Sequence, residues 1–354
     1  MATFWSDPKG LVKVISSTPV DVFVMLGDNA YSAGTDVNYQ QAVFELYADL
    51  LKNVSVWPTI GNHEMGVGKT IAAAGLDTSS DPNSYIPAKG APASRMPYLD
   101  IFTLPTEGEV GGVPSGTEQY YSFDYANVHF VSLDSQLSAR DPDQLAAMKT
   151  WLVDDLSSNN SDWTVVIFHH PPYSKGANHD SDDTTKIGGF DMPQQYMREE
   201  FVPVFDAYGV DLVYNGHSHS YERSFYLHNH LGKSDTYSAA KYAELVDGDP
   251  NRPASGRGEE GYQQLSPTSG GVDDRVVYTV TGNGGKADDS SGLTAPEQWL
   301  RHPAHILQPA DVASPKRRGM SVLGSVVVNA GKHSLQADFI NTEGEVLDSF
   351  HISR

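Results

Sequence analysis

The sequence predicts an α/β protein in which two packed, mixed β-sheets are flanked by helices. Strand and helix patterns alternate in the early part of the chain, and successive strand patterns fill its end, between residues 276 and 354. No internal repeat and no long linker divides the chain. We therefore expect one domain over 1–354, with the main motifs in 11–225, a loop-rich part in 226–275 and the last strands after it.

The first elements follow from short apolar patterns. Residues 20–26 form a nearly continuous apolar run that ends at Gly27, which is typical of a buried strand. Residues 54–60 give another strand, and Pro58 makes it irregular or places it at an edge. Between them, Asp36 or Asn38 could cap a helix whose apolar residues recur at helical spacing: Val43, Leu46, Tyr47, Leu50 and Leu51.

The middle of the chain alternates loops, strands and helices. Residues 65–118 are rich in Gly, Pro, Ser and Thr, and a loop of this length is a candidate wall of a cleft. Residues 226–275 are polar and poorly patterned. The remaining predicted elements are two strands in 120–134 joined at Ala126-Asn127, a helix marked by Leu145, Met148, Leu152 and Leu156, a strand in 163–168, a helix in 193–208 and strands in 210–214, 276–280, 321–328, 334–340 and 346–352.

The composition excludes several classes of protein. No stretch reaches the roughly 20 continuous apolar residues of a membrane span, and Met1–Asp7 lack the basic and apolar regions of a signal peptide. The formal net charge of −21 disfavours nucleic acid and anionic membranes as partners. The dense basic run at 316–318 is interpreted as a short solvated loop. An anionic substrate would therefore need a local positive charge, such as metal ions.

The chain contains no cysteine. Disulfides, thiolate zinc sites and cysteine nucleophiles are therefore excluded. A metal ion would have to be bound by His, Asp, Asn, Tyr or Glu, which favours hard or borderline ions such as Fe, Mn and Zn.

Four segments share one pattern, in which an apolar strand ends and polar residues of metal-ligand type follow at once. They are Gly27-Asp28-Asn29-Ala30-Tyr31, Gly61-Asn62-His63-Glu64, Val166-Ile167-Phe168-His169 and Gly216-His217-Ser218-His219. Strand ends are where an α/β sheet offers an open crevice. Each segment alone is a weak signal, and the first three are more often an ordinary turn or strand end, but four such segments in one chain indicate a shared site. Histidines at i and i+2 of an extended segment point to opposite sides, so His217 and His219 could address two ions, or one ion and a substrate.

These four motifs, together with Tyr31 after Gly27-Asp28 and Tyr221-Glu222-Arg223 after the paired histidines, resemble those of the purple acid phosphatases within the calcineurin-like metallophosphoesterases. The resemblance covers roughly residues 11–225, with a weaker similarity at Thr281–Gly285 and in the final strands. It implies a four-layer α/β/β/α fold and hydrolysis of a small phosphorylated substrate. It also implies two metal ions, Fe(III) together with Fe, Zn or Mn, and a secreted or periplasmic location.

The resemblance also implies a role for each matching residue. Asp28 would bridge the two ions, Tyr31 and His219 would complete one ion's ligands, and Asn62, His169 and His217 would bind the other. His63 resembles the proton donor to the leaving group. His179 matches a second histidine of the cleft, although the acidic residues after it could equally mark a solvated loop. His170 is expected to point away from the site, and Glu222 with Arg223 to form a pair that fixes the histidine loop.

One motif of the family has no match. An Asp-x-Gly at the end of a first strand should supply a further ligand on the Tyr31 side, but Asp7 has neither a preceding strand nor the right glycine spacing. The chain is therefore expected to begin in the helix that follows that strand, leaving part of a sheet unpaired unless another segment fills the gap. The Tyr31-side ion would then bind more weakly than the other, and activity would be reduced or lost.

Three functions remain open on these grounds. The working hypothesis is hydrolysis of phosphate monoesters. The second is hydrolysis of phosphodiesters or nucleotides at the same site, and the third is binding of metal or phosphate without turnover, for which the missing motif is the best support. A metallo-β-lactamase site is disfavoured, because Ser220-Tyr221 and not an Asp-His pair follows His219.

Overall fold

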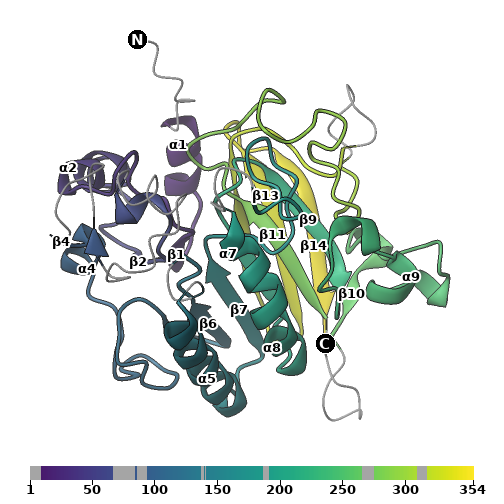
Figure 1. Cartoon of the computed structure of the whole chain (residues 1–354), viewed down its shortest axis with the longest axis horizontal. Helices are drawn as coiled ribbons and strands as arrows, with labels where there is room; N and C mark the ends of the chain where they lie inside the picture. Colours follow the sequence, from purple (N-terminus) through teal and green to yellow (C-terminus); the bar gives the residue numbers. More distant parts are fainter. Residues whose placement is uncertain are drawn as a thin grey trace.

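A six-stranded mixed sheet forms the centre of the computed structural model, which describes residues 9–66, 84–85, 94–136, 139, 141–185, 191–264, 275–308 and 317–354 (Figure 1). Its central strands are parallel, and an antiparallel strand closes each edge. In spatial order it contains β5 (Tyr121–Tyr125), β6 (Val128–Ser132), β7 (Trp163–Phe168), β8 (Leu212–Asn215), β11 (Val276–Thr281) and β9 (Tyr221–Leu227).

The second sheet layer consists of two separate pieces. One is four-stranded, in the order β10 (Tyr262–Gln263), β14 (Val346–Ser353), β13 (Ser334–Asn341) and β12 (Gly324–Ala330). The other is a parallel pair, β1 (Val22–Met25) and β2 (Ser55–Pro58). A short hairpin, β3 (Ser84–Tyr85) with β4 (Ser94–Arg95), stands apart from both. The α/β class with two packed mixed sheets is thus confirmed, and the second sheet is split between β1 and β12.

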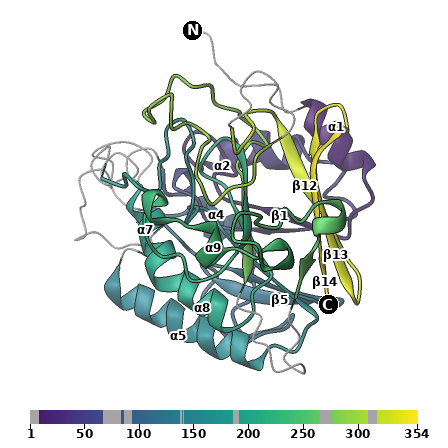
Figure 2. The same ribbon diagram turned by 90° about the vertical axis from the view of Figure 1, so that its right-hand side faces the viewer.

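Helices cover the outer faces of both sheet layers, which gives four layers in all (Figure 2). On the six-stranded sheet lie α5 (Pro142–Ser158), α7 (Met192–Tyr196) and α8 (Val202–Ala207), with a π-helical turn, η3 (Met197–Phe201), between the last two. On the other side α1 (Lys9–Ser17) packs against β1. Shorter helical segments are α2 (Asp36–Tyr39), η1 (Gln40–Glu45), η2 (His63–Met65), α4 (Pro97–Ile101), η4 (Ser234–Thr236), α9 (Ala239–Tyr242), η5 (Val246–Gly248) and η6 (Gly258–Glu260). Within the described residues, no helix is both long and apolar enough to cross a bilayer.

Two apolar layers hold the sheets and helices together. Met148 and Leu152 of α5 and Phe205 of α8 pack on the outer face of the six-stranded sheet. Its inner face, with Ile167 among others, packs on Leu335 and neighbouring residues of the four-stranded sheet. Burial of such large side chains stabilises the fold by about 1.5–3 kcal/mol each. The strands that carry the site therefore sit between two packed faces and are fixed in position.

Several local predictions need correction. The N-cap of α2 is Thr35, whose hydroxyl accepts a hydrogen bond from the Asn38 backbone N–H, so neither Asp36 nor Asn38 is the cap.

Strand β9 was not predicted, because its polar residues hide a strand that is buried along its whole length. Pro58 does mark an edge, since β2 pairs with β1 alone among the described strands. Residues 67–83 and 86–93 of the predicted cleft loop lie outside the described residues, and its described part includes the short helix α4.

Glu222 and Arg223 do not form a pair, because successive side chains of β9 point to opposite faces of the sheet. Arg223 is fully buried and binds Asp348 of β14, with Nε 2.7 Å from Oδ2 and Nη2 3.1 Å from Oδ1. This ion pair joins the two sheets through their common core. Burial opposes ionisation of Asp348, but Arg223 and Arg257 outweigh it and hold the pKa of Asp348 well below its usual range. Glu222 is the member of the two that contacts the histidine loop, because its Oε1 accepts a hydrogen bond from the Ser220 hydroxyl at 3.0 Å.

We predict that Arg223→Met destabilises the protein by about 3–5 kcal/mol, because it leaves the Asp348 carboxylate buried without its main partner. Urea unfolding followed by fluorescence would measure this loss. Arg354→Met is the matched control, since the Arg354–Asp162 pair is partly exposed and such pairs contribute about 1 kcal/mol or less. Equal effects of the two substitutions would contradict the role given to the buried pair.

Candidate metal centre

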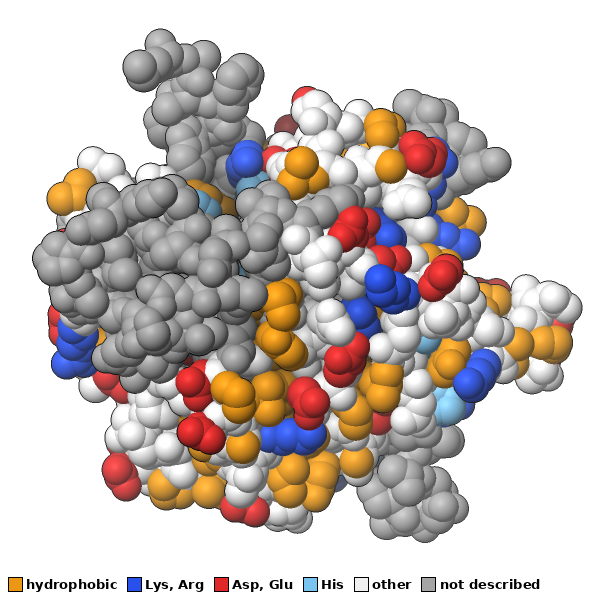
Figure 3. All heavy atoms as spheres, viewed as in Figure 1, with side chains coloured by type: hydrophobic (Ala, Val, Ile, Leu, Met, Phe, Trp, Pro, Cys, Tyr) orange, Lys and Arg blue, Asp and Glu red, His pale blue; other side chains and the backbone are white. Residues whose placement is uncertain are grey.

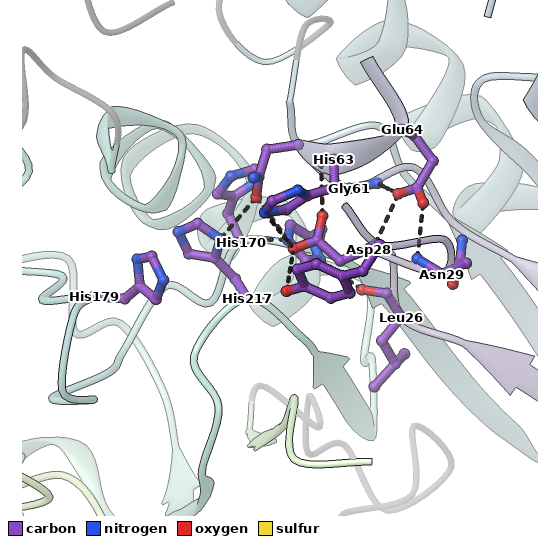
Figure 4. Close-up of polar contacts among 12 residues, drawn as sticks. Leu26, Asp28, Asn29, Gly61, His63, Glu64, His170, His179 and His217 are labelled. Carbon is purple, nitrogen blue, oxygen red and sulfur yellow. Dashed lines mark hydrogen bonds and ion pairs between the residues drawn. The ribbon is translucent and has the colours of Figure 1, made fainter. Parts of the chain in front are cut away.

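The carboxyl ends of four strands meet at one place, between the two sheet layers (Figure 4). Asp28 and Tyr31 follow β1, and Asn62 and His63 follow β2. From the six-stranded sheet, His169 follows β7, while His217 and His219 follow β8. The structure thus brings together the six residues that the sequence analysis named as metal ligands.

Four donor atoms converge on the side of β7 and β8. The Oδ1 atom of Asn62 lies 3.0 Å from His169 Nε2 and 3.1 Å from His217 Nδ1. His169 Nε2 lies 3.3 Å from Asp28 Oδ2. It also lies 3.3 Å from His217 Nδ1. Ligands about 2.0–2.1 Å from one tetrahedral ion lie roughly 3.3 Å from one another. The spacing and the types of these donors fit a single transition-metal ion.

A second group of donors shares Asp28. The Tyr31 hydroxyl lies 3.0 Å from Asp28 Oδ2, to which it donates a hydrogen bond, and 3.0 Å from His219 Nε2. Burial, reinforced by the adjacent Asp28 carboxylate, holds the pKa of the Tyr31 hydroxyl well above its usual value. A cation would have to displace that proton, after which a phenolate, a carboxylate oxygen and an imidazole nitrogen would face it. This donor set suits a hard ion.

Each of the three histidines has a hydrogen-bond acceptor on its outward nitrogen. His169 Nδ1 donates to the Leu26 carbonyl at 2.8 Å. His217 Nε2 lies 2.8 Å from Asp191 Oδ1, and His219 Nδ1 lies 2.9 Å from Asp288 Oδ2. Because these acceptors lie on the outward nitrogens, the opposite nitrogen of each ring faces the centre. Metal-binding histidines are oriented in this way.

Sequence reasoning missed Asp191 and Asp288. Neither stands next to a ligand in the chain, and both occur in loops without any local pattern. His179 Nδ1 also lies 3.0 Å from Asp191 Oδ1, so this one carboxylate contacts two histidines. The pKa of Asp288 is lowered to about 2, because its contacts with His219 and Lys286 outweigh burial. The pKa of Asp191 is also held well below its usual range, because its contacts with His179 and His217 outweigh burial, so both acids are ionised.

Burial shapes the protonation of the central groups. Burial and the nearby His179 ring lower the pKa of His217 to about 3, which keeps its imidazole neutral. Burial alone would raise the pKa of Asp28, but His169 and His63 outweigh it and hold that pKa well below its usual range. The centre thus combines an ionised carboxylate with a neutral imidazole, which are the forms that bind cations.

The buried carboxylate of Glu64 joins the loops after β1 and β2. It accepts backbone N–H groups of Asp28, Asn29 and Gly61, each at 2.7 Å. The loops approach closely, and a Cβ atom at Gly27 would lie 2.6 Å from His169 Nδ1. Asp28 itself adopts the left-handed conformation, with φ of 54°. Such backbone strain in a non-glycine residue persists only where the surroundings impose it, and it is concentrated at functional sites.

His63 and His179 both border the donors. His63 Nδ1 donates to the Ser32 carbonyl at 2.6 Å, and its Nε2 faces Asp28 Oδ2 at 4.0 Å. The His179 ring centre lies 3.7 Å from that of His217. The acidic residues after His179 do not form a solvated loop, because Asp180 and Asp182 each bind Lys175 Nζ at 2.7 Å.

The prediction that His170 points away from the site was wrong. Its ring centre lies 4.3 Å from that of His217, and its Nδ1 lies 2.9 Å from the Ser135 hydroxyl. Two groups of histidine and acidic side chains in the described part of the chain are close enough to share an ion. They are His169 with His170 and His217, and His179 with Asp191 and His217.

The model of the calcineurin-like phosphoesterase family matches residues 4–221, which include all of these strand ends. The chain belongs to the calcineurin-like phosphoesterase family. Its relatives include Purple acid phosphatase 18 of Arabidopsis thaliana, 30% identical over 240 residues, which cover 66% of this chain and 44% of that protein. Purple acid phosphatase 1 of Ipomoea batatas is 28% identical over 48% of this chain and 28% of its own length.

The fold agrees with this family. A purple acid phosphatase from seeds of yellow lupin, PPD1, superposes with a TM-score of 0.61 over 98% of this chain and 48% of that one, at 18% sequence identity. At this identity the likeness concerns the fold alone. The chain spans less than half the length of these phosphatases.

We predict that Glu64→Gln loosens the site even without metal. The amide turns an N–H group toward backbone donors, and each buried donor left unpaired costs about 1–3 kcal/mol. The free energy of unfolding should therefore fall, and hydrogen exchange should rise at residues 28–30 and 61. Glu199→Gln, in an exposed turn of η3, is the control and should leave both unchanged.

We predict that Asp191→Asn weakens metal binding by about 10–100-fold, as loss of an outer hydrogen-bond partner typically does. The asparagine can present its amide N–H to His217 Nε2 and so favour the wrong tautomer. Calorimetric titration with Zn²⁺ would measure the affinity. Asp182→Asn is the control, because Asp182 binds Lys175 and no histidine of the centre. Unchanged affinity in Asp191→Asn would contradict the proposed orientation of His217.

Proposed function

We propose that the protein hydrolyses phosphate monoesters at a centre of two metal ions. One observation carries this proposal, namely that two groups of donor atoms share the carboxylate of Asp28. A carboxylate placed between two sets of ligands suits a pair of cations held close together, as in two-metal phosphatases. The family membership and the purple acid phosphatase relatives support the reaction class.

Asn62, His169 and His217 would hold one ion, and Tyr31 and His219 the other, with Asp28 between them. We propose Fe(III) for the Tyr31 side, because a phenolate is a hard, charged donor, and Fe, Zn or Mn for the imidazole-rich side. Two such cations would neutralise the phosphate oxygens and lower the pKa of a bound water toward neutrality.

The departing alcohol needs a proton, and His63 is the proposed donor. Its Nδ1–H is committed to the Ser32 carbonyl, so its Nε2 is the atom free to act on the substrate side of Asp28. The side chain is 25% exposed, which leaves room for a leaving group beside it. His179 is proposed as a second group of the cleft, held in place by Asp191. Positioned acids and bases of this kind contribute typically about 10²–10⁴-fold to rate.

The proposed substrate is a small phosphorylated molecule. Acidic and basic side chains are interspersed on the described face that carries α5, α7 and α8, without a dense basic area there (Figure 3). Together with the net charge of −21, this argues against nucleic acid as the substrate.

Secretion and a single domain over 1–354, both expected from the sequence, stay predictions.

We predict that Asp28→Ala, Asn62→Ala and His217→Ala each lower hydrolysis of p-nitrophenyl phosphate by more than about a hundredfold, beyond the loss typical of outer partners. His333→Ala, at an exposed turn, is the control and should keep full activity. Hydrolysis of bis-p-nitrophenyl phosphate should be slower than that of the monoester. If the three variants match the unsubstituted protein, the assignment is wrong.

We predict unequal binding of the two ions. On the Tyr31 side, an ion would have three donors, from Asp28, Tyr31 and His219. On the other side, an ion would have four donors from the described chain. Metal analysis after dialysis against a graded chelator should show loss of one ion per chain before the other. With iron bound, a Tyr31 phenolate should give a violet to pink absorption, and Tyr31→Phe should abolish it. A coloured Tyr31→Phe protein would contradict this ligand.

A further inference from the structure

A buried histidine, His129 of β6, lies between two carboxylates. Its Nδ1 is 2.7 Å from Asp124 Oδ1, and its Nε2 is 2.9 Å from Asp155 Oδ2. Asp124 belongs to β5 and Asp155 to α5, so one imidazole ring connects two strands and a helix. Only 2% of the His129 side chain is exposed, and the Asp155 side chain is fully buried.

The geometry of these contacts fixes the protonation of the His129 ring. A neutral imidazole has a single N–H group and can donate to only one carboxylate. Its other nitrogen would then face a carboxylate oxygen, and two acceptors at hydrogen-bond distance repel each other. With both nitrogens protonated, each N–H group donates to one carboxylate, and both distances lie in the range of about 2.7–2.9 Å that is typical of such charged hydrogen bonds. The two contacts together therefore require the imidazolium form.

The charges around His129 favour this form. His129 lines a cavity of about 520 Å³, whose other charged lining residues are Asp124, Asp155 and Asp162. Asp162 precedes β7 and binds Arg354, which follows β14. Burial opposes the imidazolium, but the hydrogen bonds and charges of Asp155 and Asp124 outweigh it and raise the pKa of His129 above its ordinary value.

The two carboxylates differ in how well they tolerate loss of the histidine. Asp155 Oδ1 accepts hydrogen bonds from the Val113 backbone N–H at 2.8 Å and from the Ser122 hydroxyl at 2.7 Å. The Asp155 carboxylate is fully buried, and removing a partner from a buried charge is strongly destabilising. The Asp124 side chain is 46% exposed, so water can replace His129 there. When the ring is neutral, its remaining N–H therefore stays on Nε2 with Asp155, and the contact with Asp124 is lost.

We propose that His129 is a proton-operated clasp, which as an imidazolium holds the β5–β6 hairpin on α5 and which releases Asp124 when it loses a proton at alkaline pH. Because folding raises the pKa of His129, the contact with Asp124 contributes fully below about pH 6.5, the ordinary histidine value, and is lost as the pH rises through the raised pKa. Asp124 and the turn at Ala126-Asn127 line the same cavity, so the release loosens one wall of it.

The clasp is independent of the proposed phosphatase activity. His129 lies at the amino end of β6, which runs parallel to β7, whereas the proposed metal ligands follow the carboxyl ends of their strands. The clasp and the metal centre are therefore at opposite ends of the six-stranded sheet, and the clasp can be tested without measuring hydrolysis.

Nitrogen-15 NMR of the full chain with labelled histidines observes the proton directly, and His129→Gln identifies the signals of His129. We expect both ring nitrogens to carry hydrogen at about pH 6, and a titration midpoint above about 6.5. The proton that leaves should be the one on Nδ1. A single ring N–H at the lower pH, a midpoint at or below the ordinary value, or loss of the proton from Nε2 would each overturn the proposal.

Thermal unfolding separates a clasp from a contact that matters only for packing. The midpoint of His129→Gln should lie about 2 °C or more below that of the unsubstituted protein near pH 6, and the difference should shrink toward about pH 9. A difference that stays constant across this range would refute the proposal.

Asp124→Asn keeps the test decisive even where His129→Gln does not fold. The asparagine amide can donate to a neutral Nδ1, so the contact should persist at alkaline pH, and the protein should lose less stability than the unsubstituted one as the pH rises. The titration midpoint of His129 should also fall in this variant, because one of its two carboxylates is gone. Asp154→Asn, at the exposed neighbour of Asp155 on α5, is the control and should change neither property. Equal behaviour of Asp124→Asn and Asp154→Asn would contradict the clasp.

Discussion

The whole centre depends on how the buried carboxylate of Glu64 fixes two loops. Its two oxygens accept hydrogen bonds from backbone N–H groups that follow β1 and β2. Without the carboxylate, these N–H groups would be buried and unpaired. Asp28 is held in a left-handed conformation by this arrangement, and its Oδ1 in turn accepts the His63 backbone N–H at 2.8 Å. The position of the shared carboxylate is therefore set by protein hydrogen bonds before any cation is considered. Preorganisation of this kind removes the cost of ordering the ligands at the moment of binding.

The order of strands explains why the donors could be named from the sequence. Asp28, Asn62, His169 and His217 each follow the end of an apolar strand, and carboxyl ends of parallel strands gather at one edge. A local pattern therefore carried information about a site assembled from distant parts of the chain. Local strand patterns also predicted the hairpin of β5 and β6, where Ala126 takes the positive φ of the turn.

The remaining features depend on tertiary contacts that leave no local trace. Asp191 and Asp288 lie in loops, and only the folded chain brings them to the histidines. The sequence of strand β9 is polar, yet its charged residues are buried with partners from other elements. Arg223 binds Asp348, and Glu222 accepts a hydrogen bond from the Ser174 hydroxyl. Alternation along a strand then sends neighbouring charges to opposite faces, which a sequence cannot distinguish from a solvated pair.

The two sides of the centre differ in how completely the described chain encloses them. On the side of β7 and β8, His169 and His217 are buried, and each is oriented by an acceptor that is itself fixed. Tyr31 and His219, on the other side, border a groove between β1 and β12. A cation on that side would lie next to the open edge of β1, where water reduces the strength of electrostatic attraction. The predicted inequality between the two sides thus follows from the split sheet as well as from the number of ligands.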